Sequence, residues 1–442
     1  MFCSIKSMYS VTRCVLRGFG KISEVFETHT GIKQGASSSV ILFIIFLDDI
    51  IDVLKEKCIP EPILQDLHCL LHADDTLVIS TNRESFIHKC NTLIETLDTK
   101  KMLLNYKKSG YMIINGKEND LKCDLKIESG WLQYKQSQKY LGVMISDTGV
   151  LKTDVSLFIE KKKKDVNVKL ASFLTKNDTA PIFIKLKVVN ACINSTLTYG
   201  CEAWGSTPLN TVEVLQRKAL KMILDIRRNT PNEIVYIESG HTTVQPMIYK
   251  RQLKFFHKVK EDCLKDPTST IAKIFTLGID TNTKFLKHYK TLDDKFPTPE
   301  ACFQFYVNQH KTNTSTKIQN KYDNDVDSIL GTYKRINPSL DQPIFHKNIS
   351  CYENDRKIIT RYRTGSHDLK IQSGRLAKTI RNDRKCSCGD NVQTLKHVIF
   401  DCETTVSIRR IHNITESNLE SFFDSTDYVR TASILNAIEE II

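Results

Sequence analysis

Two adjacent carboxylates, Asp74 and Asp75, stand at the centre of residues 67–80, where two apolar-rich runs flank a short polar core. The pattern predicts a strand, a tight turn and a second strand, which would lift both carboxylates to the tip of a hairpin. Adjacent carboxylates on a rigid support suit Mg²⁺, a hard cation that prefers oxygen ligands and substrate phosphates. Nucleotidyl transfer with two metals uses such carboxylates to hold the ions close together. The alternative is a polar turn that only closes the hairpin, since Asp-Asp also occurs at 48–49 and 293–294.

A second set of metal-binding residue types lies near the C-terminus, where Cys386, Cys388, His397 and Cys402 occur within one short segment. Thiolates with one imidazole at short loop spacing suit tetrahedral Zn²⁺. Gly389 would permit the turn that brings the first two sulfur atoms to one ion. Four protein ligands leave no open position, so the site would be structural rather than catalytic. The alternative is four unrelated residues, because one residue between the first two cysteines is a tight spacing.

The segment His-Ala-Asp-Asp at 72–75 resembles the palm signature of reverse transcriptases, in which an aromatic residue usually precedes Ala-Asp-Asp. Three further motifs of that family surround it in the expected order: Gly-Ile-Lys-Gln-Gly at 31–35 followed by Ser39, Asn-Tyr-Lys-Lys-Ser at 105–109, and Tyr-Leu-Gly-Val at 140–143. Together they resemble the polymerases of non-LTR (LINE-like) retrotransposons. The basic segment that leads into the cysteine set resembles the zinc-binding tail of the same elements.

The resemblance implies an RNA-directed DNA polymerase in which Asp74 and Asp75 are the catalytic carboxylates and hold Mg²⁺ or Mn²⁺. It implies an RNA template, RNA–DNA duplex and deoxynucleoside triphosphates as partners. The residues it assigns to nucleotide or template contact are Gly31, Gln34, Gly35, Ser39 and Lys108. An ammonium is a good point-charge partner for a triphosphate, although a solvated pair of lysines would give the same sequence at 107–108.

The chain departs from the family pattern at several positions. Residues 36–40 read Ala-Ser-Ser-Ser-Val where relatives usually have Asp-Pro-Leu-Ser-Pro, and His72 replaces the usual aromatic residue. The family's third carboxylate comes from a strand well before the glycine motif, but the first aspartate here is Asp48, and the only earlier acids are Glu24 and Glu27. We therefore expect a truncated copy that lacks the first catalytic carboxylate and the fingers. The alternative is a non-catalytic nucleic-acid-binding remnant that acts through its basic helices and zinc tail.

Charge is distributed unevenly along the 442 residues, whose formal net charge is +12. Lys and Arg number 18 against 18 Asp and Glu in residues 1–150, 42 against 25 in residues 151–400, and 3 against 8 in residues 401–442. A neutral first part followed by a basic body suggests contact with a polyanion behind the catalytic part. Solubility alone could also account for a charge of this size.

Local patterns predict the elements that would position these residues. Residues 26–28 fit a strand, and a helix is expected from Gln34 to about Lys57. A capping box at 81–84 should begin a helix, whose apolar face would contain Phe86, Cys90, Leu93, Ile94 and Leu97. Residues 140–145 fit a strand that closes the palm.

Residues 153–260 have the pattern of basic amphipathic helices. One helix places the lysines at 161–164 away from a face made of Val155, Phe158 and Val166. A second helix has an apolar face of Val212, Leu215, Ala219 and Met222. They resemble a polymerase thumb, whose phosphate contacts give salt-dependent affinity without sequence specificity. Solvated outer faces are the alternative. The polar stretch at 308–324 predicts a connector with short helices.

These observations predict an α+β chain with four regions. They are a partial palm at 1–150, a helical thumb-like region at 151–262, a connector at 263–345, and a basic C-terminal region with a zinc-knuckle-like module at 346–442. Fourteen scattered cysteines favour a reducing compartment. The sequence has no pattern of a signal peptide, and its longest apolar run is too short to span a bilayer. We expect a soluble intracellular protein of the nucleus or cytoplasm with no membrane partner, and the oligomeric state stays open.

Overall fold

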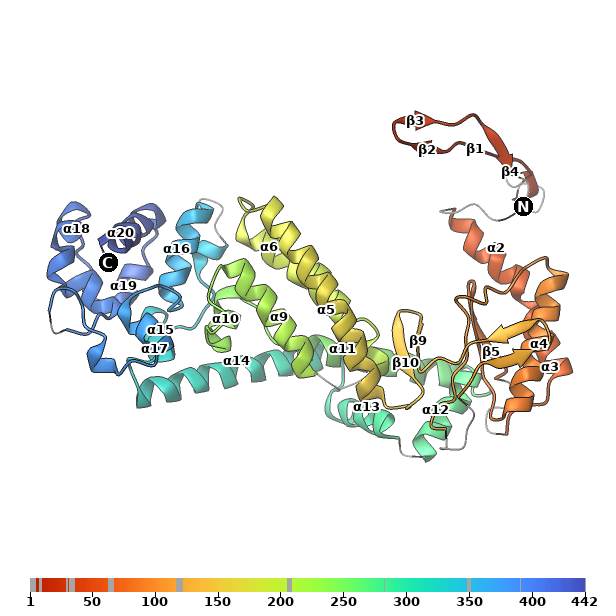
Figure 1. The fold of residues 1–442 in the computed structure, drawn as a ribbon. Helices are drawn as coiled ribbons and strands as arrows, with labels where there is room; N and C mark the ends of the chain where they lie inside the picture. Colours follow the sequence, from red (N-terminus) through yellow and green to blue (C-terminus); the bar gives the residue numbers. More distant parts are fainter. Residues whose placement is uncertain are drawn as a thin grey trace. The chain divides into compact units, whose positions relative to one another are not determined.

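The computed structural model describes residues 5–7, 10–28, 31, 36–62, 67–116, 122–204, 209–281, 283–347, 351–389 and 391–441. Short antiparallel strand pairs lie in the first third of the chain and helices make up most of the remainder (Figure 1). The predicted α+β class is confirmed. The chain divides into two compact units, one of Met1–Gly149 with Asp266–Ile274 and one of Val150–Lys265 with Phe275–Ile442.

The strands of the first unit pair two by two, all antiparallel, within the described residues. The pairs are β1 (Thr12–Cys14) with β4 (Phe26–Thr28), β2 (Arg17–Gly18) with β3 (Lys21–Ile22), β5 (Cys69–His72) with β6 (Asp75–Val78), β7 (Leu125–Ile127) with β8 (Gly130–Leu132), and β9 (Ser137–Tyr140) with β10 (Val143–Ser146). The strand expected at 26–28 is confirmed. The single strand expected at 140–145 is wrong, because Leu141 and Gly142 take positive φ values of 45° and 84° and turn the chain back as a hairpin.

The helix expected from 34 to 57 is two helices, α2 (Ser37–Leu47) and α3 (Asp49–Lys57). At Asp48 the backbone N–H bonds to the Ile45 carbonyl, three residues back instead of four, which interrupts the regular ladder. The first two expected positions, 34 and 35, lie outside the described residues. Acidic residues in the first turn of α3 suit the positive end of a helix dipole.

The helix expected after 81–84 is α4 (Arg83–Thr99), but its cap differs from the capping-box prediction. Asn82, not Thr81, caps the helix, and its side chain accepts a hydrogen bond of 2.8 Å from the Ser85 backbone N–H. Thr81 instead binds Glu61. The predicted apolar face is confirmed, since Cys90, Leu93 and Ile94 are buried.

Two small cores hold the first unit together. One joins α2, α3, α4 and the β5–β6 pair through buried Leu47, Ile50, Leu54, Cys58, Cys69 and Leu93. The other joins α4 to the β7–β8 pair through buried Cys90, Ile94, Tyr111, Leu125, Ile127 and Leu132. Val78, at the end of β6, packs against both cores. The hairpin that carries Asp74 and Asp75 is therefore anchored from its base.

The second unit begins with the predicted run of helices. Its elements are α5 (Leu151–Lys176), α6 (Ile182–Val188), a π-helical turn (Val189–Asn194), α7 (Ser195–Leu197), α8 (Cys201–Trp204), α9 (Leu209–Leu224), α10 (Asn232–Ser239) and α11 (Gln245–Lys265). Val155, Phe158 and Val166 of α5 are buried, as predicted. On α9 the prediction fails at Met222, which is 43% exposed, because the buried face runs through Leu220 and Ile223 instead.

The short helices expected at 308–324, within the connector predicted at 263–345, are wrong, while the connector itself stays a prediction. These residues form the second half of α14 (Pro299–Asn324), a continuous helix that packs along α11 and reaches α15 (Ile329–Ile336) (Figure 1). Thr298 caps it through a 3.1 Å bond to the Ala301 N–H, and Pro299 suits the first turn. Among the described residues of α14, only the side chains of Cys302 and Ile318 are buried. A helix that buries so few apolar side chains shows no broad apolar stripe in its sequence. The other helices between α11 and α14 are α12 (Thr270–Asp280) and α13 (Lys284–Lys295).

The C-terminal part of the second unit surrounds one apolar core. Its helices are α16 (Glu353–Arg363), α17 (Lys370–Leu376), α18 (Val406–Ile411), α19 (Leu419–Phe423) and α20 (Tyr428–Ile441), and α16 packs on α20. The core includes Ile358, Tyr362, Val398, Phe422, Ile434 and Leu435.

A fully buried carboxylate, Glu238 of α10, ties this part to the preceding helices. It accepts hydrogen bonds from Arg363 (3.1 Å), Tyr333 (2.8 Å) and His346 (2.9 Å). Burial opposes its ionisation, but Arg363 and His346 hold the pKa of Glu238 at about 2.

None of the helices in the described part of the chain combines the length and the apolar character needed to cross a bilayer.

Candidate functional site

The β5–β6 pair forms the hairpin that the sequence predicts around the Asp-Asp motif. His72 and Asp75 are partners in the strand register, so Ala73 and Asp74 alone make the turn. Ala73 takes φ of +52°, a conformation that two-residue hairpin turns require at their first position. Both carboxylates are exposed at the tip. The predicted placement of Asp74 and Asp75 is confirmed, while their role as metal ligands stays a prediction.

Partner groups distinguish this Asp-Asp pair from the other two in the chain. Asp49 forms an ion pair of 2.7 Å with Lys100. Asp293 accepts hydrogen bonds of 2.8 Å from both His257 and Lys260. Among the described residues, no cationic side chain pairs with the carboxylates at 74 and 75. Their oxygens are therefore available to an external cation, as the Mg²⁺ prediction requires.

Tyr140, at the end of β9, lies close enough to the hairpin to sense its charge. Burial raises the pKa of the Tyr140 hydroxyl, and the Asp75 carboxylate and the Cys69 thiol raise it further. An electrostatic interaction thus links residues of two motifs that the sequence places in the family's order, the Asp-Asp turn and the Tyr-Leu-Gly segment.

A buried ion pair holds the base of the hairpin. The Lys89 ammonium of α4 is fully buried; it binds the Glu61 carboxylate and donates to the Ile79 carbonyl at 2.9 Å, just beyond β6. Glu61 also accepts from the Thr81 N–H at 2.9 Å and from the Thr81 hydroxyl at 2.6 Å. Burial opposes ionisation of Glu61, but Lys89 and Thr81 hold its pKa at about 2. These bonds fix the chain where it leaves the hairpin.

The sequence prediction missed this ion pair. The signal was present, because Lys89 stands three residues after Phe86 and four before Leu93, on the apolar face of α4. A lysine at such a position requires a buried partner, since an unpaired buried charge is costly.

The other residues assigned by resemblance have separate placements. Gly31 has φ of +92°, which favours glycine. Ser39 lies in α2 with its side chain buried, and Lys108 is exposed on a turn where its N–H bonds to the Asn105 carbonyl at 3.1 Å. Gln34 and Gly35 lie outside the described residues. Their nucleotide and template contacts stay predictions.

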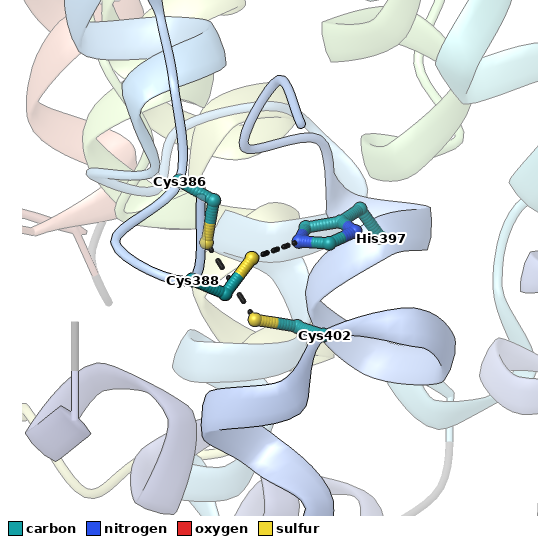
Figure 2. A group of neighbouring side chains, drawn as sticks. All are labelled: Cys386, Cys388, His397 and Cys402. Carbon is teal, nitrogen blue, oxygen red and sulfur yellow. Dashed lines mark hydrogen bonds between the residues drawn. The ribbon is translucent and has the colours of Figure 1, made fainter. Parts of the chain in front are cut away.

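The predicted zinc ligands come together in the C-terminal part of the second unit (Figure 2). The ligand atoms of Cys386, Cys388, His397 and Cys402 all lie within 4.8 Å of one another. The Sγ atoms of Cys386 and Cys402 are 3.6 Å apart, and Cys388 Sγ is 3.2 Å from His397 Nε2. Zinc–sulfur bonds of about 2.3 Å place two sulfurs of a tetrahedron about 3.8 Å apart. The side chains present therefore fit a zinc ion in ligand type, number and spacing.

Local backbone structure explains why these side chains meet. Gly389 has φ of +141°, which only glycine adopts readily, and its N–H bonds to the Cys386 carbonyl at 3.3 Å. The Cys402 N–H bonds to the His397 carbonyl at 2.7 Å across a π-helical turn (His397–Asp401). The predicted turn at Gly389 is confirmed.

A neighbouring glutamine supports the cluster. Gln393 donates to Cys386 Sγ at 3.7 Å and accepts from the Lys370 backbone N–H at 2.7 Å, which links the cluster to α17. Burial opposes ionisation of Cys386, but the Cys388 N–H and the neighbouring ligand side chains lower its pKa to about 6. The thiolate is the form of cysteine that binds metal, and burial and the neighbouring side chains raise the pKa of the Cys388 thiol, while these side chains lower that of Cys386. Gln393 carried no signal in the sequence, because a polar residue beside a ligand set is common.

Residues 2–145 match the family described as reverse transcriptase (RNA-dependent DNA polymerase). The matched segment contains the Asp-Asp turn, the buried ion pair at its base and the Tyr-Leu-Gly segment, so this part of the chain is similar to a reverse transcriptase domain. The match ends before α5. No curated protein matched the chain.

Proposed function

We propose that this chain is a nucleic-acid-binding protein of the non-LTR reverse-transcriptase type, with a hairpin for divalent metal, a helical body for duplex and a zinc-binding tail. The observation that carries the proposal is the Asp74–Asp75 turn, which presents two exposed carboxylates without cationic partners among the described residues. The family match of residues 2–145 supports it, because the turn lies inside that segment.

The residues of the first unit have distinct tasks in this proposal. Mg²⁺ or Mn²⁺, when bound, would stabilise the attacking and leaving oxygens of nucleotide transfer. Asp74 and Asp75 offer it oxygen ligands, and Lys89 with Glu61 keeps the hairpin in position. Lys108 offers its ammonium to a triphosphate. The residues proposed for further nucleotide or template contact are Gly31, Gln34, Gly35 and Ser39.

The number of carboxylates limits the chemistry. In the described part of the chain, the only group of three or more metal-binding side chains is the cysteine and histidine cluster, so no third ligand accompanies Asp74 and Asp75. One turn cannot fix two ions at the spacing that two-metal transfer needs. We propose that the chain alone binds divalent metal weakly and does not extend a primer. RNA-directed DNA synthesis would need a carboxylate from outside the described residues.

This shortage favours nucleic-acid binding without catalysis over RNA-directed DNA synthesis by the chain alone. Residues 151–400 carry 42 Lys and Arg against 25 Asp and Glu, an excess of 17. Many of them lie on α5, α9 and α11, where they would contact phosphates of an RNA template or RNA–DNA duplex. The zinc ion at Cys386, Cys388, His397 and Cys402 would be structural in either function.

Iron-mediated cleavage tests the hairpin as a metal site without requiring activity. Fe²⁺ in place of Mg²⁺, with ascorbate and peroxide, generates radicals that cut the backbone beside the bound ion. We expect cleavage near residues 72–76 that excess Mg²⁺ suppresses and that Asp74→Asn with Asp75→Asn removes. The matched control is Asp293→Asn with Asp294→Asn, because Asp293 is already occupied by His257 and Lys260. Cleavage that is absent from the hairpin, or that survives the substitution at 74 and 75, would contradict the proposal.

A further inference from the structure

The two tryptophans of the chain have opposite environments. Trp204 of α8 is buried at 1% exposure, and its indole N–H donates to the Tyr199 carbonyl at 2.9 Å. Trp131 of β8 is 58% exposed, although it is among the largest apolar side chains. A tryptophan that is exposed on a strand has its ring face accessible to a ligand.

The β7–β8 pair presents Trp131 outward on a fixed support. Leu125 pairs with Leu132 in the strand register, and both are buried in the core with α4. Side chains alternate across a strand, so the intervening register partners Lys126 and Trp131 share the outer face. Both are exposed.

A loop from the predicted Asn-Tyr-Lys-Lys-Ser motif braces the tip of this hairpin. The Tyr106 hydroxyl donates to Ser129 Oγ at 2.6 Å, and a Cβ atom on Gly130 would lie 3.0 Å from the Tyr106 ring. The contact places the exposed Lys107 and Lys108 next to the hairpin. The β7–β8 hairpin is therefore held on its inner face by the core and at its tip by Tyr106.

Three exposed lysines lie on the β7–β8 hairpin and on the loop that braces it. Lys107, Lys108 and Lys126 make no ion pair with a carboxylate in the described part of the chain. Glu128 is the one acidic residue of segment 125–132. An exposed aromatic ring with one lysine opposite it in the strand register, and two more lysines on the loop that braces the hairpin, fits single-stranded nucleic acid, in which bases stack on the ring and phosphates meet the cations. A paired duplex does not offer a free base face to such a ring.

We propose that Trp131 is a base-stacking platform for an unpaired nucleotide of single-stranded RNA or DNA, and that Lys126 and Lys107 contact the adjacent phosphates. This inference rests on the proposed nucleic-acid-binding function and adds to it a specific site in the first unit. It separates single-strand contact on the β7–β8 hairpin from the duplex contact proposed for the basic helices.

Tryptophan fluorescence of the full-length protein tests the platform directly. Titration with an unlabelled oligouridylate should quench the emission, because a stacked base contacts the ring. Trp204→Phe should keep the quenching and Trp131→Phe should lose it, since Trp204 is buried. Trp131→Ala should bind a labelled oligouridylate about tenfold more weakly in fluorescence anisotropy. Tyr352→Ala removes another exposed aromatic, at 72% exposure, and should bind as the unchanged protein does.

Three results would overturn the inference. Binding seen by anisotropy without quenching of Trp131 would refute the platform and leave the proposed function intact. Equal quenching by fully paired duplex would refute the requirement for an unpaired base. Absence of any binding at low salt would refute both the platform and nucleic-acid binding.

Discussion

Lys89 is the residue on which the base of the Asp74–Asp75 hairpin depends. Its ammonium is fully buried between the Glu61 carboxylate and the Ile79 carbonyl, so one side chain connects α4, the segment before β5 and the end of β6. A buried ion pair adds little net stability compared with apolar residues, but removal of one partner leaves an uncompensated charge. The hairpin is therefore sensitive to a change far from its tip.

We predict that Lys89→Met lowers the free energy of unfolding of the first unit by about 3–5 kcal/mol. Denaturant unfolding followed by Trp131 emission measures this, because Trp131 lies in the first unit and Trp204 in the second. Lys55→Met, at an exposed position of α3, is the control and should change stability by less than about 0.5 kcal/mol.

Adding Glu61→Gln to Lys89→Met should recover much of the loss, because no buried charge then remains and the amide oxygen still accepts from Thr81. Equal stability of Lys89→Met and Lys55→Met would show that the ion pair does not support the hairpin.

At the scale of elements, sequence patterns predicted the helices and turns whose formation depends on residues close together in the chain. The Asp-Asp hairpin, α4 and the turn at Gly389 each follow from residues that are neighbours in the chain. The long α14 was not predicted, because its stability comes from packing along α11 and its own residues give a weak periodic signal. Glu61 is separated by 28 positions from Lys89, so only the fold reveals that they pair.

The cysteine and histidine cluster is the element for which sequence and structure agree most closely. Four residues predicted from type and spacing alone have ligand atoms within 4.8 Å of one another. The cluster links separate segments of the C-terminal part. Gln393 connects Cys386 to Lys370 of α17, and Cys402, which lies beside Cys386, belongs to the segment before α18. A metal ion there would hold the tail together, since structural zinc contributes directly to folding.

We predict about one equivalent of zinc per chain, consistent with a single four-ligand site. Cys386→Ser with Cys402→Ser should lose the zinc and lower the melting temperature of the tail, whereas Cys263→Ser should retain it. Elemental analysis and thermal unfolding with and without chelator measure both effects. Co²⁺ substitution should give the visible absorption of a tetrahedral thiolate site. A zinc-free protein whose melting is unaffected by chelator would contradict the prediction.

At the scale of the whole molecule, charge separates the chain into parts of different character. Residues 1–150 carry 18 basic and 18 acidic residues, while residues 151–400 carry 42 and 25. The basic residues 151–400, which follow the neutral residues 1–150 in the sequence, would bind a duplex through its phosphates. Such contacts release counterions. Affinity of this kind depends on salt and not on base sequence.

We predict that affinity for an RNA–DNA duplex falls about tenfold or more between low and physiological salt and is similar for unrelated sequences. Charge-reversal at the exposed lysines of α5, with Lys161→Glu and Lys164→Glu, should weaken binding and reduce the salt dependence. The matched pair Lys55→Glu and Lys57→Glu on α3 leaves the body unchanged and should have a smaller effect. Affinity that is constant across the salt range would contradict phosphate contact.

Primer extension on an RNA template tests the central claim, that the two carboxylates of one turn are insufficient for synthesis. The full 442-residue chain is assayed with Mg²⁺ or Mn²⁺ beside the double variant Asp74→Asn, Asp75→Asn. An active reverse transcriptase serves as the positive control for the assay. We predict the same background signal from both proteins, because no third ligand accompanies the turn in the described residues. Template-dependent DNA synthesis that disappears in the double variant would contradict the account and require a further carboxylate at this hairpin.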